Sequence, residues 1–196
     1  MIMDVQPVVL EGQHVRLEPL DPVHATGLHE IGREEADWAY MPRGGFRDQA
    51  DCLRWIEESQ SSGDQLPFAI IDREQGCPAG STRYLAIRPE HRGLEIGWTW
   101  LGRAWQRSPV NTETKLLLLG HAFETLGALR VEFKTDERNV RSQQALERIG
   151  AMREGVFRNH MVVQQGHVRH SVYFSIIDSE WPAVRGRLEE KLGRSG

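Results

Sequence analysis

The chain has 196 residues, of which 39% are hydrophobic, and a net charge of -4, so it is long and apolar enough to build a folded core. Its acidic and basic residues are interspersed, which argues against a nucleic-acid partner. No apolar run approaches the roughly 20 residues needed to span a membrane. Two cysteines without metal-like spacing predict neither a disulfide framework nor a metal site. The first residues lack a basic region followed by an apolar core, so we expect a cytoplasmic protein without a secretory signal.

The first half of the chain predicts a strand, two helices and two more strands. Asp21-Pro22 is typical of a helix start, with an N-cap residue followed by proline. Between the two helices, residues 36–46 are aromatic and glycine-rich without a period, which indicates a loop. We expect Trp38, Tyr40 and Met41 in this loop to shape a substrate pocket. The expected strands are 14–20, 67–72 and 81–88, and the expected helices start at Asp21 and near Asp48.

The stretch from Leu94 to Gly127 predicts a strand, a polar turn and a leucine-rich helix. Leu94, Ile96, Trp98 and Trp100 alternate with Glu95, Gly97, Thr99 and Leu101, close to the period of two expected of a strand. The helix is expected to open on Asn111 and Thr112 and to end at Gly127. Because the first amides of a helix have no internal partner and attract anions, this turn is a candidate phosphate site. The basic residues that would suit a polyphosphate there are Arg103, Arg107 and Lys115.

The last third of the chain alternates strands with helices. Asn139 can cap a helix that Gly150 ends, and Gln165-Gly166 is typical of a hairpin turn between two strands. The expected strands are 130–135, 156–163 and 167–177, and residues 180–192 are expected to form a terminal helix or a partly frayed segment. The whole order predicts one mixed α/β domain over residues 1–196, with its core at about 13–180.

Several motifs in this order resemble the GCN5-related N-acetyltransferase (GNAT) family, and in particular its RimJ/RimL-like branch. They are Glu95-Ile96-Gly97-Trp98, residues 106–115 (QRSPVNTETK), Arg130-Val131-Glu132, Asn139-Val140-Arg141-Ser142, Ile149-Gly150-Ala151 and Glu154-Gly155-Val156-Phe157-Arg158. The resemblance covers roughly residues 13–180. It implies a central, mostly antiparallel, twisted sheet of about seven strands, with a splayed fourth and fifth strand and about four flanking helices.

The resemblance also implies acetyl-CoA as co-substrate and no metal. The family's pyrophosphate loop reads Q/R-x-x-G-x-G/A, and this chain departs from it with Pro109 and Asn111. Proline removes one N–H donor, and we expect Asn111 to compensate by capping the helix. The expected cofactor-binding residues are Trp98, Thr99, Trp100, Leu101, Arg107, Ser108, Val110, Asn111, Thr112, Lys115, Asn139 and Ser142.

Enzymes of this family transfer the acyl group directly to an amine. The resemblance implies that backbone amides near residues 98–101 polarise the thioester, and it favours Glu95 as general base, with His160 and His170 as alternatives. Ser142 would protonate or stabilise the leaving thiolate, and Tyr173 is the alternative acid. The acceptor is an amine of a protein or a small molecule. A succinyl or other acyl donor, an inactive CoA-binding domain and a homodimer all remain open.

Overall fold

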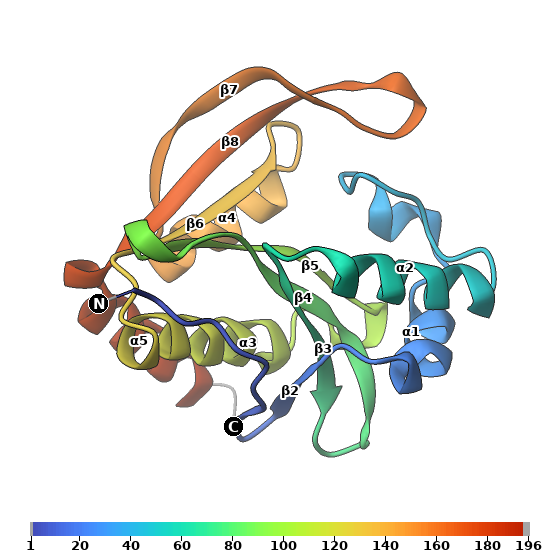
Figure 1. Ribbon diagram of the computed structural model, residues 1–196, viewed down its shortest axis with the longest axis horizontal. Helices are drawn as coiled ribbons and strands as arrows, with labels where there is room; N and C mark the ends of the chain where they lie inside the picture. Colours follow the sequence, from blue (N-terminus) through green and yellow to red (C-terminus); the bar gives the residue numbers. More distant parts are fainter. Residues whose placement is uncertain (1, 194–196) are drawn as a thin grey trace.

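The computed structural model describes residues 2–193, and its centre is a twisted sheet of eight strands in the order β1-β2-β3-β4-β5-β6-β8-β7 (Figure 1). Among the described strands, β5 and β6 form the parallel pair and all other neighbours are antiparallel. The strands are β1 (Leu10–Glu11), β2 (Val15–Pro19), β3 (Leu66–Asp72), β4 (Cys77–Arg88), β5 (Gly93–Leu101), β6 (Arg130–Asp136), β7 (Met152–Val162) and β8 (Val168–Ile177).

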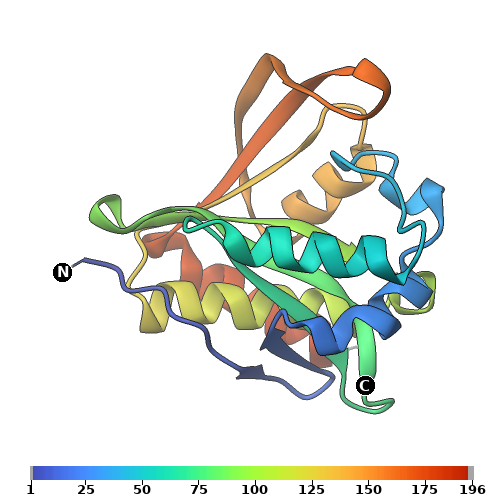
Figure 2. The ribbon, with the colours of Figure 1, turned by 45° about the vertical axis from the view of Figure 1, so that its right-hand side comes forward.

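Helices cover both faces of the first part of this sheet (Figure 2). They are α1 (Ala25–Ile31), α2 (Gln49–Ser61), α3 (Pro109–Gly120), α4 (Val140–Ile149) and α5 (Trp181–Gly193). At its end α3 continues in a wider π-helical turn, His121–Thr125. The hairpin of β7 and β8 extends beyond the helices and arches over one side of the sheet (Figure 1). No described helix is long and apolar enough to cross a membrane.

Two hydrophobic clusters lie on the two faces of the sheet. The larger one joins α3, α4 and α5 to the sheet through fully buried residues such as Leu94, Leu118 and Phe174. The smaller one joins α1 and α2 to the other face and centres on Trp38, Phe46 and Trp100. Both clusters follow from the apolar stripes of the helices, because such a stripe is stable only when it is packed against another element.

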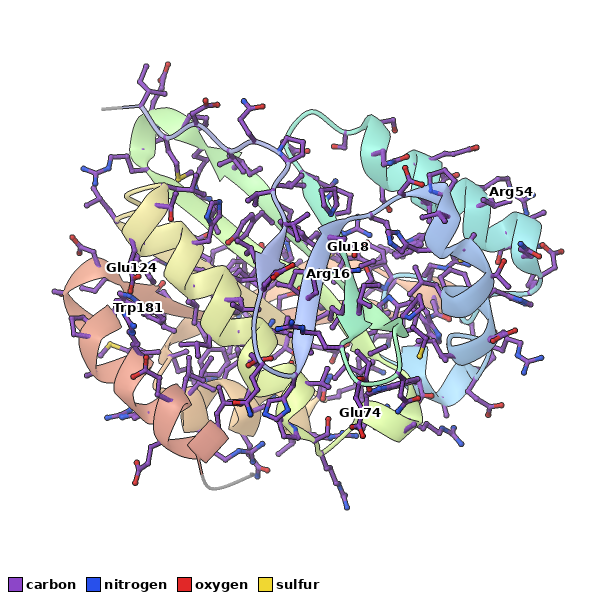
Figure 3. The ribbon with its side chains drawn as sticks, turned by 90° about the horizontal axis from the view of Figure 1, so that it is seen from below. Arg16, Glu18, Arg54, Glu74, Glu124 and Trp181 are labelled. Carbon is purple, nitrogen blue, oxygen red and sulfur yellow. The ribbon has the colours of Figure 1, made fainter. Side chains whose placement is uncertain are left out.

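Two polar contacts anchor α3 at its ends. The buried carboxylate of Glu113 accepts hydrogen bonds from the backbone amides of Gln13, His14 and Val15, at 2.6–2.7 Å, and so ties the start of β2 to the helix. At the other end, Glu124 lies beside Trp181 of α5 (Figure 3) and accepts a hydrogen bond of 2.7 Å from its indole nitrogen. The first contact ties the start of α3 to the sheet, and the second ties the π-helical turn that follows α3 to α5.

The mixed α/β fold expected from the sequence is confirmed, including the mostly antiparallel sheet. The expected numbers were approximate, since the sheet has eight strands and the structure has five helices. The additional strand is the two-residue β1, which pairs with β2 and is too short to leave a periodic pattern. The expected strand at 156–163 begins earlier, at Met152.

Candidate active site

The parallel strands β5 and β6 separate part of the way along their length. They pair at Gly93↔Arg130, Leu94↔Val131 and Glu95↔Glu132, and the pairing then stops although both strands continue. Beyond Glu95 the two strands diverge, so the edge of β5 that faces β6 is free of strand partners. The splayed pair that the resemblance implied is therefore present, and it opens a gap in the middle of the sheet.

A β-bulge at Trp98 changes which face the rest of β5 presents. Trp98 has a φ of +51°, and two residues of β5, Trp98 and Thr99, oppose the single Thr82 of β4 between the pairs Arg83↔Gly97 and Ser81↔Trp100. A bulge adds one residue and so exchanges the two faces of a strand. Ile96 consequently belongs to the larger cluster and Trp100 to the smaller one. The strand predicted from the alternating apolar residues is confirmed, but for this reason those residues do not all lie on one face.

The polar turn after β5 leads into the first turn of α3. Ser108 is the N-cap, with its hydroxyl accepting from the amide of Val110 at 3.3 Å, and Pro109 is the first helical residue. The prediction that Asn111 caps the helix is wrong, because the helix begins earlier, where proline is well tolerated. Arg107 precedes the cap with a φ of +61°. The amides at the start of this helix and its dipole make a site for an anion.

The first turn of α4 lies beside this turn, because parallel strands end at the same edge of a sheet. Asn139 caps α4 by accepting from the amide of Ser142 at 3.0 Å. Arg141 then donates to the side-chain oxygen of Gln106 at 3.2 Å, which bridges the two helix starts. The open end of the gap is thus bordered by two helix N-termini and by the basic side chains of Arg107 and Arg141.

Lys115 of α3 enters the gap between the two strands. Its Nζ atom donates to the hydroxyl of Thr99 on β5 at 2.9 Å and lies 5.7 Å from the ring centroid of Phe133 on β6. The residue is 7% exposed, and burial lowers the pKa of its amine to about 7. Lys115 is therefore placed inside the gap, whereas Arg103 is drawn away to an ion pair with Asp37 at 3.2 Å.

Glu95 lies where the gap begins, on the face opposite the larger cluster. It is 3% exposed, and one of its oxygens accepts from Lys134 of β6 at 3.0 Å. Its other oxygen occupies room left by Gly97, since a Cβ atom on that glycine would lie 2.9 Å from Glu95 Oε1. Burial raises the pKa of this carboxyl group, while the neighbouring Lys134 opposes the change.

Polar side chains of β7 and β8 gather on the same face. The ring of His160 contacts the hydroxyl of Ser171 at 2.9 Å and that of Tyr173 at 3.4 Å. Two extra residues in β7 between Phe157 and Met161 displace this part of the strand, where Asn159 has a φ of +49°. Burial, then the charges of Lys134 and Arg169, lower the pKa of His160, which favours its neutral form.

An open hollow of about 750 Å³ lies at this displaced part of β7. Its lining residues are Phe157, Arg158, Asn159, His160 and His170. His160 and His170, the two expected alternatives for the general base, make different contacts in the structure. His160 contacts Tyr173, which β8 places opposite Lys134, whereas His170 is held by the amide of Asn159 at 2.8 Å.

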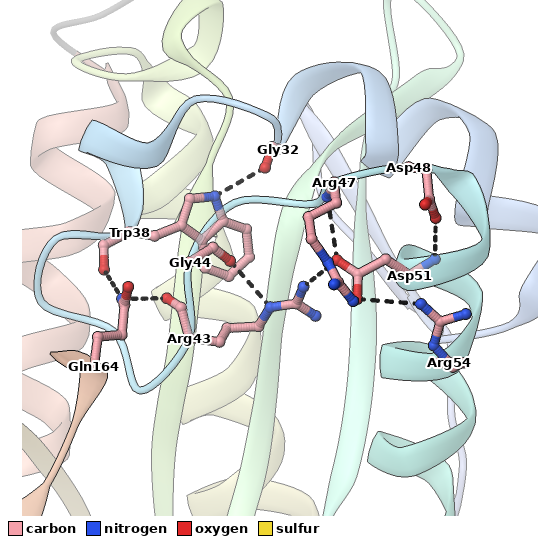
Figure 4. A network of polar contacts seen from close by, with 9 residues as sticks. All are labelled: Gly32, Trp38, Arg43, Gly44, Arg47, Asp48, Asp51, Arg54 and Gln164. Carbon is pink, nitrogen blue, oxygen red and sulfur yellow. Dashed lines mark hydrogen bonds and ion pairs between the residues drawn. The ribbon is translucent and has the colours of Figure 1, made fainter. Parts of the chain in front are cut away.

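The loop before α2 closes this side of the site. Gln164 at the tip of the β7–β8 hairpin donates through its amide nitrogen to the carbonyl oxygens of Trp38 and Arg43 (Figure 4). The same nitrogen also donates to the carbonyl oxygen of Met41. The guanidinium carbon of Arg138, just before α4, lies 5.7 Å from the ring centroid of Tyr40. Tyr40 is exposed and Met41 half-buried, whereas the Trp38 side chain is fully buried and bonds Gly32 at 2.9 Å.

Two residues of this site were not expected from the sequence. Lys134 falls within the strand expected at 130–135, and Gln164 stands beside the hairpin turn expected at Gln165-Gly166, but neither was named as a site residue. Their partners are Glu95 and the loop of residues 38–43, which are distant in sequence, so no local pattern identified them. No cluster of side chains that could hold a metal ion occurs among residues 2–193.

Comparison with known proteins identifies the class of enzyme. Residues 14–152 match the sequence profile of the acetyltransferase (GNAT) domain, so the chain belongs to the GNAT family of acetyltransferases. Its relatives support the RimJ/RimL-like branch within that family.

Three similar proteins illustrate the relationship. A GCN5-related N-acetyltransferase structure from Brucella melitensis is 33% identical, with a TM-score of 0.91, and the match covers 96% of this chain and 86% of that one. YdaF of Bacillus subtilis (strain 168), provisionally named a ribosomal N-acetyltransferase, is 32% identical over 86% of this chain and 94% of its own. RimJ of Mycobacterium smegmatis, solved with CoA-disulfide, shares the fold at 20% identity, with a TM-score of 0.80 and coverage of 94% and 95%.

Proposed function

We propose that this enzyme transfers the acetyl group of acetyl-CoA directly to a primary amine of a protein or a small molecule. The observation that supports the proposal most strongly is the gap between β5 and β6. It connects an anion site at two helix N-termini with a buried carboxylate, Glu95, on the other side of the sheet. A long substrate with phosphates at one end and a reactive group at the other fits such a passage.

The open end of the gap is suited to the phosphates of CoA. The amides of the first turn of α3 and the guanidinium of Arg107 would hold the pyrophosphate, and Pro109 stands at the one helical position where its missing N–H is least costly. The amide of Asn139 would bind the pantetheine arm near the start of α4. The residues proposed for donor binding are Arg107, Ser108, Val110, Asn111, Thr112 and Lys115, with Trp98, Thr99, Trp100 and Leu101 of β5, and Asn139 and Ser142 of α4.

The free edge of β5 provides donors for the reacting carbonyl. Beyond Glu95 its backbone amides lack a β6 partner, and the bulge at Trp98 reorients the chain there. A donor held in place at a developing oxyanion typically stabilises a transition state by about 3–4 kcal/mol. We propose that the segment from Trp98 to Leu101 supplies this stabilisation.

Glu95 is the proposed general base. Its raised pKa brings the carboxylate closer to the basicity needed to take a proton from an ammonium group, and its Oε1 atom lies over Gly97, beside the bulge. His160 is the second candidate, because its lowered pKa keeps it neutral.

The acceptor would enter between the β7–β8 hairpin and the loop that contains Tyr40 and Met41, with the backbone of Trp38 forming part of the wall. The hydroxyl group of Ser142 or Tyr173 would donate a hydrogen bond to the leaving thiolate.

The proposal is tested by measuring thiol release from acetyl-CoA with a panel of peptides, polyamines and amino acids. With an accepted amine, Glu95→Gln should lower kcat about a hundredfold or more and leave acetyl-CoA binding unchanged. The wild-type rate should fall as the pH drops through the pKa of Glu95, which lies above its ordinary 4.5, and this acidic limb should vanish in the variant.

The matched control is Glu57→Gln on the exposed surface of α2, which should behave as wild type. If Glu95→Gln keeps the wild-type rate and the acidic limb of the pH–rate profile, Glu95 is not the base and His160 becomes the first candidate. Release of thiol from succinyl-CoA but not from acetyl-CoA would overturn the proposed donor.

A further inference from the structure

The most unusual ionisable group in the gap is Lys115. It projects from the second turn of α3 and ends between Thr99 on one strand and Phe133 on the other, with 7% of the residue exposed. Asn111 lies one helical turn earlier on the same side of α3. Lys115 is therefore roughly 6 Å deeper along the helix than the amides of the anion site, and its side chain extends into the gap.

Lys115 has no acidic partner in the described part of the chain. Burial alone accounts for the change in its pKa, with no carboxylate acting on it, and its polar contact is the neutral hydroxyl of Thr99. Lys134 differs from it, since that lysine is paired with Glu95. A buried amine that can carry a charge is costly without a counter-ion, so its presence suggests that a bound ligand brings negative charge to this point.

We propose that Lys115 protonates the sulfur of coenzyme A as it leaves, so that this lysine serves the thioester end of the donor rather than its phosphates. The inference rests on the proposed function, because it needs the donor to lie in the gap. Thr99, which accepts the hydrogen bond from Lys115, lies next to Trp98, in the segment proposed above to donate backbone amides to the reacting carbonyl.

The chemical step is balanced by groups that the site and the substrates contain. When the carbon–sulfur bond breaks, its electron pair remains on sulfur, and a proton moves from the Lys115 ammonium to that thiolate. The product is free thiol and a neutral lysine, which then regains a proton from solvent. The transfer is favourable because the pKa of Lys115 is about 7, whereas an ordinary thiol has a pKa of about 8.5.

The test is a thermodynamic cycle that needs no turnover. Calorimetric titration at pH 7.5 would compare CoA with desulfo-CoA, in which hydrogen replaces the thiol, on the wild type and on Lys115→Met. If the amine contacts the sulfur, the variant should lose about tenfold more affinity for CoA than for desulfo-CoA. Lys191→Met, on α5, should bind both ligands as the wild type does.

Folding of the variant is checked by thermal unfolding. Lys115→Met places an apolar group of similar length beside Phe133, so it should be at least as stable as the wild type. An equal loss of affinity for both ligands would overturn the role of Lys115 and leave the proposed function intact. Failure of the wild type to bind either ligand would overturn both. An acetyl group found by mass spectrometry on Lys115 after incubation with acetyl-CoA would also overturn the inference, because the amine would then be a nucleophile.

Discussion

Gly97 shows how one missing side chain leaves room for the proposed general base, Glu95. Its φ is not positive, so the position does not need glycine for a left-handed backbone conformation. What it supplies is space, since a Cβ atom there would lie 2.9 Å from Glu95 Oε1 and 3.0 Å from a methyl group of Leu85. Both neighbours are ends of side chains and can move, so a larger residue would displace them without breaking the strand.

This geometry predicts a separation of activity from stability in Gly97→Ala. The free energy of unfolding should change by no more than about 1 kcal/mol, because only side-chain ends must move. The rate of acetyl transfer should fall about tenfold, since a displaced base loses its alignment. The free energy of unfolding is measured by urea denaturation, and the rate of acetyl transfer by thiol release.

Gly186→Ala is the matched control for this substitution. Gly186 is exposed on α5, and a Cβ atom added there would have no neighbouring atom within 4 Å. Alanine there should stabilise the helix by about 1 kcal/mol and leave the rate unchanged. Wild-type activity in Gly97→Ala would show that the position of Glu95 over Gly97 does not matter for the reaction.

Among the elements, the β7–β8 hairpin and the loop before α2 act together. The amide nitrogen of Gln164 donates to the loop carbonyls of Trp38 and Arg43 (Figure 4) and to that of Met41. On the loop side, the Arg43 guanidinium pairs with Asp51 of α2 at 2.8 Å. The hairpin tip is thus tied through the loop to a helix that packs on the sheet, and this connection borders the proposed acceptor entrance.

Gln164→Glu should release this connection, because a carboxylate cannot donate to three carbonyl oxygens and is repelled by them. We expect the KM for the amine to rise several-fold, with the affinity for acetyl-CoA unchanged, and hydrogen exchange in residues 38–43 to become faster. Gln165→Glu makes the same change at an exposed position of the same turn and should affect neither. Equal KM values in the two variants would contradict a role of this connection in acceptor binding.

For the molecule as a whole, the sequence predicted the fold well where local patterns determine it. The leucine-rich stripe of α3, the cap at Asn139 and the hairpin turn at Gln165-Gly166 all have a local cause and lie where they were expected. The start of α3 was misplaced because Ser108 and Asn111 are both good capping residues, and only the structure shows which one is used. Periodicity also could not reveal the bulge at Trp98, since one extra residue changes the face without changing the apolar pattern.

The candidate site was harder to predict because its residues come together from distant strands. The resemblance pointed to Glu95 and Ser142, but the pairing of Glu95 with Lys134 and the placement of His160 beside Tyr173 depend on strand register. The burial of Lys115 likewise depends on how α3 packs against the splayed strands. These are long-range properties, which no local motif encodes.

The central claim is that the gap between β5 and β6 holds acetyl-CoA, and calorimetric titration of the purified protein with acetyl-CoA tests it most directly. Free CoA and succinyl-CoA would be titrated alongside, and Arg107→Ala would remove one cation from the anion site. We predict one-to-one binding of acetyl-CoA by the wild type and binding about tenfold weaker in the variant. Absence of binding by a protein shown to be folded would contradict the account.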